Sequence, residues 1–290
     1  MQKFRQTMNP ILLVIPILSV LMFDLGLTLT GDDFTRLLRE PRAVIVGLAG
    51  QLILLPLVAA ALVLVFRPRA EFALGFVLLA CCPGGSSSNI FSKLAGGNVA
   101  LSVTMTALSS VLTLFTLPVL MDVAVDWVQA DYAGIHLPVG NLVVQNIVLM
   151  ALPILLGIAV RRLAPRVAAK TDRVLSRLAF PALMLLAGIF FVQHHATIGE
   201  HIGSLGLMAL LLIVTASTMG ALVGKVTGLE KRERRTIVIE IGMQNAAQAI
   251  AIATSPFVLA NEVVAIPAVI YALIMNVVLL CYVGVIRQRA

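Results

Sequence analysis

Two short polar stretches interrupt an otherwise apolar chain, and they hold the residues best suited to bind an ion or a small polar solute. The first covers residues 81–89 (CCPGGSSSN) and the second covers residues 240–248 (EIGMQNAAQ). Each lies where a helix is expected to run through lipid without a break. Unpaired backbone and charge are costly inside a bilayer unless they line a protected cavity. Two such interruptions, in corresponding places of two halves of a chain, are typical of the binding site of a secondary transporter.

Glu240 has the clearest chemical consequence in the second stretch. Gln244, Asn245 and Gln248 follow it, and positions 240, 244 and 248 share one helical face if the helix is unbroken. A carboxylate inside a membrane is costly unless it is paired. No Lys or Arg falls within the core of a predicted span to pair with it, and Lys93 lies near a helix end. Protonation or a bound cation are the remaining options, and a set of oxygen ligands favours a hard cation over a transition metal. A polar network that merely joins helices is the structural alternative.

The first stretch is suited to an anion. Residues 83–85 are Pro-Gly-Gly, which removes an amide donor and adds two flexible positions, so a helix is expected to stop there. Ser86, Ser87 and Ser88 can cap a new half-helix, whose free N–H groups and positive end favour an anion. Asn89 adds a side-chain carbonyl. The structural alternative is a proline kink whose serines are hydrogen-bonded to their own backbone.

The composition predicts an all-α polytopic membrane protein with no soluble domain. The 290 residues are 60% hydrophobic and 12% charged, whereas a soluble domain has roughly 25% charged residues. The first apolar run continues through Leu29 without a small-residue cleavage site, which favours a mature span over a signal peptide. Cys81, Cys82 and Cys281 all lie in apolar context and are expected to be small buried side chains.

The apolar segments predict nine transmembrane helices, of which the third and the eighth are the interrupted ones. Their expected bounds are about 9–30, 43–66, 71–96, 98–121, 139–160, 178–194, 203–224, 236–259 and 264–286. If the C-terminus is cytoplasmic, most of the 21 basic residues fall on the cytoplasmic side, in segments 36–42, 161–177 and 225–235. Nine spans then place the N-terminus outside. The net charge of +7 is explained by this orientation and gives no reason to expect a nucleic-acid partner.

The order of the predicted helices indicates an internal inverted repeat. Helices two to four form a triple with a broken middle member, and so do helices seven to nine. The two triples run in opposite directions through the membrane, which is the architecture of many secondary transporters. The halves contain four and five helices, so one helix is missing at the N-terminus.

At these residues the sequence resembles the bile acid:sodium symporter family. The resemblance rests on residues 75–111, with CCPGGSSSN followed by GNVALS, and on residues 239–248, with EIGMQN. It extends over nearly the whole chain and implies a nine-helix bacterial-type member forming a single transporter domain, residues 1–290. It also implies core helices at about 43–121 and 203–286, in which the broken helices cross, and panel helices at about 9–30 and 139–194.

The resemblance further implies two sodium ions and an organic anion as ligands. For the first sodium ion the matching positions are Ser88, Asn89, Ser102, Thr106 and Glu240. For the second they are Gln51, Glu240 and Gln244, with the backbone carbonyls of Ile241 and Met243. The substrate is expected near Ser86, Ser87, Asn245, Gln248 and Asn276. From the residues alone, Gln51, Ser102 and Thr106 fit interhelical contacts equally well. The polar Gln248, and Met275 before Asn276, depart from relatives and argue against assuming bile acid specificity.

The predicted function is therefore sodium-coupled symport of an organic anion by alternating access. The anion is either a small hydroxy or keto carboxylate or a bile-acid-like steroid. The expected location is the inner (plasma) membrane, with no enzymatic activity and no resident cofactor beyond the two coupling ions. The bilayer is the other partner, and the chain is either a monomer or an oligomer of undefined size. Proton-coupled transport and a non-transporting membrane sensor stay open as alternatives. A membrane enzyme using Ser86 to Ser88 is disfavoured, because no histidine falls in a span core.

Overall fold

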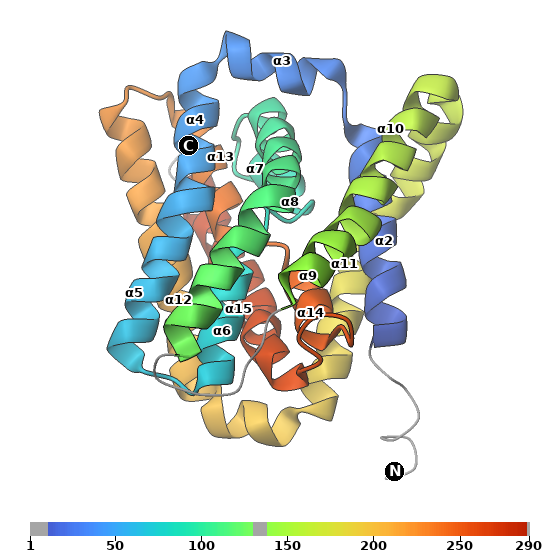
Figure 1. Ribbon diagram of the computed structural model, residues 1–290. Helices are drawn as coiled ribbons and strands as arrows, with labels where there is room; N and C mark the ends of the chain where they lie inside the picture. The colour runs from blue at the N-terminus through green and yellow to red at the C-terminus, as the bar shows by residue number, and fades with distance from the viewer. Residues whose placement is uncertain (1–10, 130–137, 289–290) are drawn as a thin grey trace.

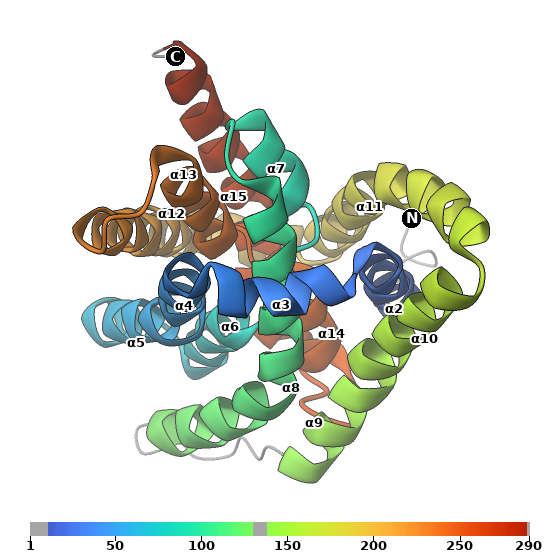
Figure 2. The same ribbon diagram turned by 90° about the horizontal axis from the view of Figure 1, so that it is seen from above.

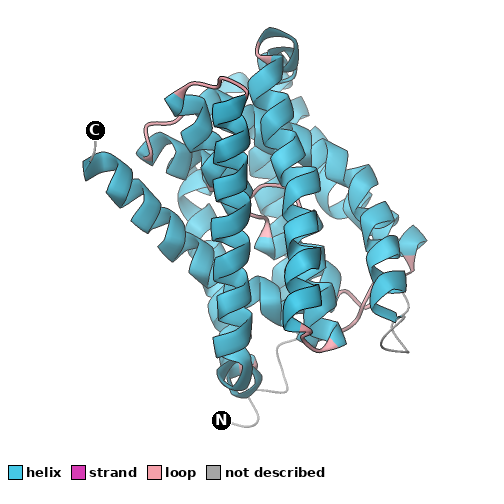
Figure 3. Ribbon diagram, turned by 90° about the vertical axis from the view of Figure 1, so that its left-hand side faces the viewer, coloured by secondary structure: helices cyan, strands magenta, loops and turns pink. Residues whose placement is uncertain are grey.

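The computed structural model describes residues 11–129 and 138–288, and these are folded almost entirely into helices joined by short loops (Figures 1 and 3). The helices, in chain order, are α2 (Ile11–Thr28), α3 (Gly31–Arg39), α4 (Pro41–Ala49), η1 (Gly50–Leu54), α5 (Leu55–Phe66), α6 (Ala70–Cys81), α7 (Ser88–Leu94), α8 (Val99–Gln129), α9 (Val139–Asn146), η2 (Ile147–Ala151), α10 (Leu152–Leu163), α11 (Pro165–Gln193), α12 (His195–Val226), α13 (Lys231–Gly242), α14 (Ala246–Thr254) and α15 (Glu262–Gln288). Segments η1 and η2 are single turns of π-helix.

Five continuous helical segments are long and apolar enough to cross a membrane, which makes the chain a multi-pass membrane protein. They are Pro41–Phe66, Val99–Trp127, Val139–Leu163, His195–Val226 and Glu262–Gln288. Large apolar side chains such as Leu57, Val65 and Leu155 are more than half exposed on these helices, as expected for surfaces that face lipid. The all-helical class is therefore confirmed, while the count of nine crossings and the inverted repeat stay predictions.

The helices form two outer groups with a central set between them, and α3 crosses one end of the molecule. Figure 1 shows α2, α10 and α11 together on one side, with α4, α5 and α12 on the other and α6, α8, α14 and α15 between them. Seen from above, α3 passes over α8 and connects α2 with α4 (Figure 2). The start of α3 is stabilised by a capping box. The backbone N–H and the hydroxyl of Thr30 both donate to the carboxylate of Asp33.

Helices α2 and α10 pack backbone against backbone. A Cβ atom added to Gly26 would lie 2.2 Å from the carbonyl oxygen of Ile154, and one added to Gly157 would lie 2.3 Å from that of Phe23. Only glycine permits such an approach at these two positions. Small residues at an interface of this kind are a common means of joining helices in lipid, where there is no hydrophobic driving force between them.

Both π-helical turns come directly before a proline in an apolar helix. Leu54 ends η1 two residues before Pro56, and Ala151 ends η2 two residues before Pro153. A proline lacks the amide hydrogen that the regular helical pattern needs, and widening the preceding turn accommodates this loss without a sharp break. A buried amide side chain accompanies each turn: Gln51 lies within η1, and Asn146 directly precedes η2.

Several helices are longer than the hydropathy predicted. Helix α11 begins at Pro165 instead of near residue 178, α12 begins at His195 instead of near 203, and α8 continues to Gln129. Hydropathy marks only the part of a helix that suits lipid, whereas backbone hydrogen bonding continues through polar residues until a cap or a break stops it. Pro165 stands at a helix start, where its missing N–H has no partner to lose.

Candidate functional site

The two interrupted helices meet at their breaks and hydrogen-bond to each other through main chain. Gly84 and Gln244 form an antiparallel β-bridge. The N–H of Gly85 donates to the carbonyl oxygen of Met243 at 2.9 Å, and the N–H of Asn245 donates to that of Pro83, also at 2.9 Å. Each break thus satisfies backbone groups that the other leaves free, which is what makes irregular backbone tolerable at membrane depth.

The expected serine cap of the first half-helix does not form through a side chain. Ser87 occupies the position before α7, but no side-chain hydrogen bond caps the helix, and the Oγ atom of Ser87 is buried without a partner. The turn is instead closed by main chain, with the N–H of Ser88 donating to the carbonyl oxygen of Gly85 at 2.9 Å. The hydroxyl of Ser87 is consequently available to another ligand.

Glu240 lies at the centre of a hydroxyl cluster beside the crossing. Its side chain is fully buried, and its two carboxylate oxygens accept hydrogen bonds from Ser102 and from Thr106, the latter at 3.0 Å. Because the hydroxyl hydrogen of Thr106 is directed at the carboxylate, the contact of 3.2 Å between Ser88 and Thr106 is best described with Ser88 as the donor. Helices α7, α8 and α13 are joined at this one carboxylate.

Lysine and arginine take no part in this cluster. Within the described ranges the ion pairs are Arg36–Glu40, Arg69–Glu71 and His194–Glu262, and none of them involves Glu240. Nor do the described residues contain a group of three or more His, Cys, Asp or Glu side chains arranged to hold a metal ion. The cluster is therefore built from one carboxylate and neutral oxygen atoms, a donor set that suits a hard monovalent or divalent cation.

Gln51 reaches the same place from η1. A Cβ atom added to Gly84 would lie 2.9 Å from Nε2 of Gln51 and 3.0 Å from Oε2 of Glu240, so both side chains face the first break. Gln51 is fully buried, yet neither its Oε1 nor its Nε2 atom has a hydrogen-bond partner. A buried amide with no partner costs about 1–3 kcal/mol for each unsatisfied group, so both atoms of Gln51 are candidates to contact an ion or a water molecule.

Gln244 and Asn89 also hold buried oxygens without partners. The amide nitrogen of Gln244 donates to the carbonyl oxygen of Ile241 at 3.0 Å, while its Oε1 atom has no partner. The carbonyl oxygen of Met243 already accepts from Gly85. The Oδ1 atom of Asn89 is buried and unpartnered as well, although no hydrogen bond links Asn89 to the Glu240 cluster.

The single helical face proposed for positions 240, 244 and 248 is not formed. Helix α13 ends at Gly242 and α14 begins at Ala246, so Gln248 is no longer on a continuous helix with Glu240. Glu240 points to the hydroxyls of α8, whereas Gln248 contacts Asn146 at the end of α9. The break therefore separates one polar stretch of sequence into two polar environments.

A small cavity of about 20 Å³ lies against the crossing, with room for about one water molecule. Its polar lining comes from the two breaks and includes Ser86, Ser87 and Asn245. Its apolar lining comes largely from methionines on α2, the second break, α11 and α15: Met22, Met243, Met184 and Met275. Flexible methionines allow a wall to adapt to more than one ligand shape.

Two residues expected at the substrate lie outside this lining. Asn276 donates its Nδ2 hydrogen to the carbonyl oxygen of Ala272 at 2.6 Å, one turn along α15 from the cavity. Gln248 lies in the first turn of α14, where its backbone N–H donates to Oδ1 of Asn245 at 3.1 Å. Both residues are thus neighbours of cavity residues without lining the cavity themselves.

Sequence reasoning missed several residues that complete this region. Ser109 accepts from the N–H of Gly84 at 3.3 Å and fastens the first break to α8. Tyr271 donates its hydroxyl to the carbonyl oxygen of Gly242 at 3.1 Å and satisfies the end of α13. Helix α9 carries three amides in an apolar segment: Asn141, Gln145 and Asn146. That unusual composition was the signal available for finding them.

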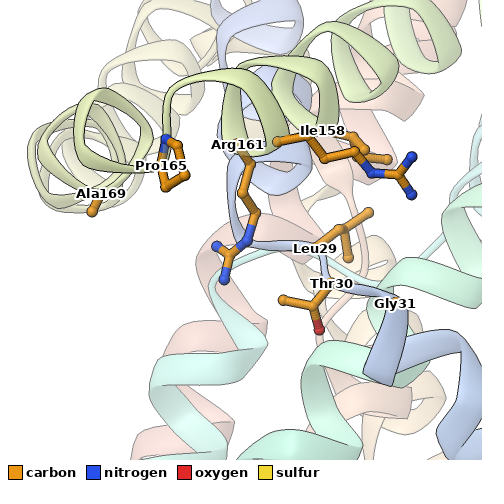
Figure 4. Close-up of a pocket in the computed structure, with 8 residues that line it drawn as sticks. Leu29, Thr30, Gly31, Ile158, Arg161, Pro165 and Ala169 are labelled. Carbon is orange, nitrogen blue, oxygen red and sulfur yellow. The ribbon is translucent and has the colours of Figure 1, made fainter.

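A second cavity, of about 540 Å³, shares no lining residue with the crossing. It lies between the end of α2 and the turn that joins α10 to α11 (Figure 4). Leu29, Thr30 and Gly31 form one side of it, and Arg161 reaches towards them from α10. The guanidinium of Arg161 donates to the carbonyl oxygen of Leu27 at 2.6 Å. Since a cation at the end of a helix satisfies free carbonyls, this arginine holds α2 to α10.

Comparison with known proteins gives one consistent result. Residues 15–201 match the model of the sodium bile acid symporter family. The chain is 33% identical over 266 residues to the "Uncharacterized sodium-dependent transporter YocS" of Bacillus subtilis (strain 168), which covers 89% of this chain and 78% of that protein. It is 32% identical over 262 residues to the "Probable sodium/metabolite cotransporter BASS2, chloroplastic" of Oryza sativa subsp. japonica, covering 89% of this chain and 60% of that one.

A more distant similarity connects the chain to an animal protein. It is 26% identical over 233 residues to the "Ileal sodium/bile acid cotransporter" of Homo sapiens, which covers 79% of this chain and 65% of that protein. The matched family model covers more than half of the chain, and the buried oxygen cluster lies on helices within and beyond the matched range. The chain belongs to the sodium bile acid symporter family.

Proposed function

We propose that this protein is a secondary active transporter that couples the inward movement of sodium to that of an organic anion. The observation that carries the proposal is the buried carboxylate of Glu240, which has hydroxyl oxygens around it and no basic partner among the described residues. A charge in such a position needs a counter-ion or a proton. The names of relatives, sodium-dependent transporter and sodium/metabolite cotransporter, favour sodium.

The first sodium ion is proposed to bind between Glu240 and the hydroxyls around it. Ser88, Ser102 and Thr106 form a connected chain of contacts that ends on the carboxylate. A hydroxyl that donates its hydrogen to a carboxylate keeps lone pairs free, so the same oxygen can also coordinate a cation. Asn89 supplies a further oxygen, since its Oδ1 atom is buried without a partner.

The second ion is proposed to bind on the other side of the same carboxylate. Gln51 and Gln244 contribute amide oxygens that are buried and unpartnered. The backbone carbonyls of Ile241 and Met243 complete the set. Each of these two already accepts one hydrogen bond, but a carbonyl oxygen has two lone pairs and can contact a cation with the second.

The organic anion is proposed to bind at the crossing, where the first turn of α14 and the unpartnered hydroxyl of Ser87 meet the small cavity. Ser86 and Asn245 lie in the cavity wall, while Gln248 and Asn276 lie one turn behind it. The positive end of a helix and its free N–H groups favour a carboxylate. A cavity of about 20 Å³ is too small for such a ligand, so the surrounding helices must separate to admit it.

We propose that the protein works by alternating access between two groups of helices. The core helices, at about 43–121 and 203–286, hold the ion cluster and the crossing. The panel helices, at about 9–30 and 139–194, contribute Met22 and Met184 to the wall of the cavity. Movement of the core against the panel would expose the anion first to one side of the plasma membrane and then to the other. The C-terminus lies in the cytoplasm in this scheme and the N-terminus outside, and the protein has no enzymatic role.

Two sodium ions moving with one monoanion would carry one net charge. At 100 mV and a tenfold sodium gradient the driving force is about 5 kcal/mol, enough for an accumulation of several thousandfold. The test is uptake of labelled carboxylates into proteoliposomes, with external sodium replaced by choline. Loss of uptake in choline is the expected result. Uptake that is undiminished in choline and follows a pH gradient would replace sodium by the proton, and binding without flux would indicate a sensor.

A further inference from the structure

Asn146 and Gln248 form a buried amide pair between two helices, and the proposed contacts to the sodium ions and to the carboxylate of the anion leave this pairing unused. Asn146 is 2% exposed at the end of α9, and Gln248 is 1% exposed in the first turn of α14. The Nε2 atom of Gln248 donates to Oδ1 of Asn146 at 3.5 Å, which is long for a hydrogen bond. The Nδ2 atom of Asn146 and the Oε1 atom of Gln248 have no partner.

The chemistry of the unsatisfied atoms specifies what would fit between them. One is a donor and the other is an acceptor, and exchanging oxygen for nitrogen in both amides leaves the same combination. A hydroxyl group can accept from the first and donate to the second. A keto oxygen or a carboxylate can only accept, and an apolar group can do neither. Water has the same two capabilities as a hydroxyl and is the natural occupant when no solute is bound.

The position of the pair connects it to the proposed anion site. The backbone N–H of Gln248 donates at 3.1 Å to the side chain of Asn245, which lines the small cavity, so Gln248 is bonded directly to a residue of the cavity wall. Gln145, the neighbour of Asn146, lines a separate crevice of about 410 Å³ together with Ser255. Gln248 is thus bonded to a residue of the cavity wall, and Asn146 follows a residue of the crevice wall in the chain.

The backbone around Asn146 gives a second reason to expect a ligand. The π-helical turn η2 begins at the next residue, and π-helical turns occur frequently at functional sites. The other π-helical turn, η1, carries the buried, unpartnered Gln51. In each place a distorted helical turn accompanies an amide whose hydrogen-bonding capacity is not used.

We propose that Asn146 and Gln248 together form a hydroxyl subsite of the organic anion site, so that the transporter selects carboxylates with a hydroxyl group a few carbons from the carboxylate. This inference rests on the proposed function. The hydroxyl replaces one long amide contact with two hydrogen bonds of ordinary length. Because Asn146 belongs to the proposed panel and Gln248 to the core, a hydroxylated substrate also connects the two groups of helices, whereas its unsubstituted counterpart does not.

The test compares acids that share one carbon skeleton. Purified protein in constant sodium is titrated with butanoate, 2-oxobutanoate and 2-, 3- and 4-hydroxybutanoate, and ligand affinity is obtained from thermal stabilisation. At least one hydroxy acid is expected to bind about tenfold more tightly than butanoate, the value of one added pair of hydrogen bonds. Asn146→Leu should remove that preference while leaving butanoate affinity unchanged.

Asn141→Leu is the matched control. Asn141 lies on the same helix and donates to the carbonyl oxygen of Phe257 at 2.7 Å, so its loss also removes a contact between α9 and the core, but its amide is not part of the pair. The hydroxyl preference should survive in this variant. Equal affinities in the wild type, a preference that survives Asn146→Leu, or no binding of any of these acids would overturn the proposal. Sodium-dependent stabilisation, which depends on Glu240, reports separately on the proposed function.

Discussion

Asn245 donates its backbone N–H to the carbonyl oxygen of Pro83 at 2.9 Å, joining two breaks that are far apart in the sequence. This contact satisfies backbone at a depth where water is absent, and it fixes the half-helix α14 in direction relative to α7. Any ligand bound at the crossing therefore contacts both interrupted helices at once. The proposed sodium ions, by holding Glu240 to α8, would preorganise the same place.

The first prediction concerns the charge of Glu240. Glu240→Gln preserves the size of the side chain but removes the charge that attracts a cation, so sodium affinity should fall at least about tenfold. The protein should still fold, because Ser102 and Thr106 can rotate their hydroxyls to suit an amide. The measurement is thermal stabilisation by sodium chloride relative to choline chloride at equal ionic strength.

Glu200→Gln is the control for this measurement. Glu200 is an exposed carboxylate on α12, and its replacement should leave the sodium response intact. If Glu240→Gln responded to sodium as the wild type does, the carboxylate would not be part of an ion site. A variant that fails to fold would be identified by its elution and helical content, and Glu240→Asp would then serve in its place, with weakened sodium affinity expected.

The second prediction concerns the packing of α2 on α10. Gly157→Ala would place a methyl group 2.3 Å from the carbonyl oxygen of Phe23, which cannot move without displacing the helix. Overpacking of this kind costs about 1–3 kcal/mol, and the melting temperature should fall accordingly. Gly140→Ala, on α9, meets nothing within 4 Å and should melt as the wild type does. Equal melting of both variants would refute the close approach of the helices.

Much of this architecture follows from local sequence. The first break was predictable because Pro83 and its two glycines cannot continue a helix, and Glu240 stood out as a candidate site residue because a carboxylate is so costly in lipid. Neither argument needs tertiary information. The positions of Gln51, Ser102 and Thr106 at that carboxylate came instead from the resemblance to a family, since a single amide or hydroxyl in an apolar helix has many possible partners.

The remaining features depend on contacts between distant segments. The hydrogen bond from Gly85 to Met243 and the pairing of Asn146 with Gln248 join elements whose separation in the sequence carries no local signal. The same limitation applies to the face that Glu240 and Gln248 would share only in an unbroken helix. The break at residues 240–248 was predicted, but the backbone hydrogen bonds from the first break that stabilise it leave no mark in sequence periodicity.

The third prediction separates two hydroxyls on one helix. Ser102 donates to Glu240, whereas Thr104, equally buried on α8, donates to the carbonyl oxygen of Ala100 in its own helix at 2.9 Å. Ser102→Ala should lower sodium affinity by about three- to tenfold, and Thr104→Ala should change it little. Sodium titration of both variants by thermal stabilisation checks this. A similar loss in the two would mean that α8 hydroxyls act on stability and not on the ion.

The last prediction tests whether the first break and the ion cluster share one space. Gly84→Ala adds a methyl group 2.9 Å from Nε2 of Gln51 and 3.0 Å from Oε2 of Glu240. Both atoms end movable side chains, so the fold should survive while the geometry around the carboxylate changes. We expect sodium affinity to fall about tenfold or more, with little change in melting temperature without sodium. Gly199→Ala, which meets nothing within 4 Å, supplies the comparison. Sodium affinity that is unchanged by Gly84→Ala would separate Gln51 from the ion site and leave Glu240 with the hydroxyls of α8 alone.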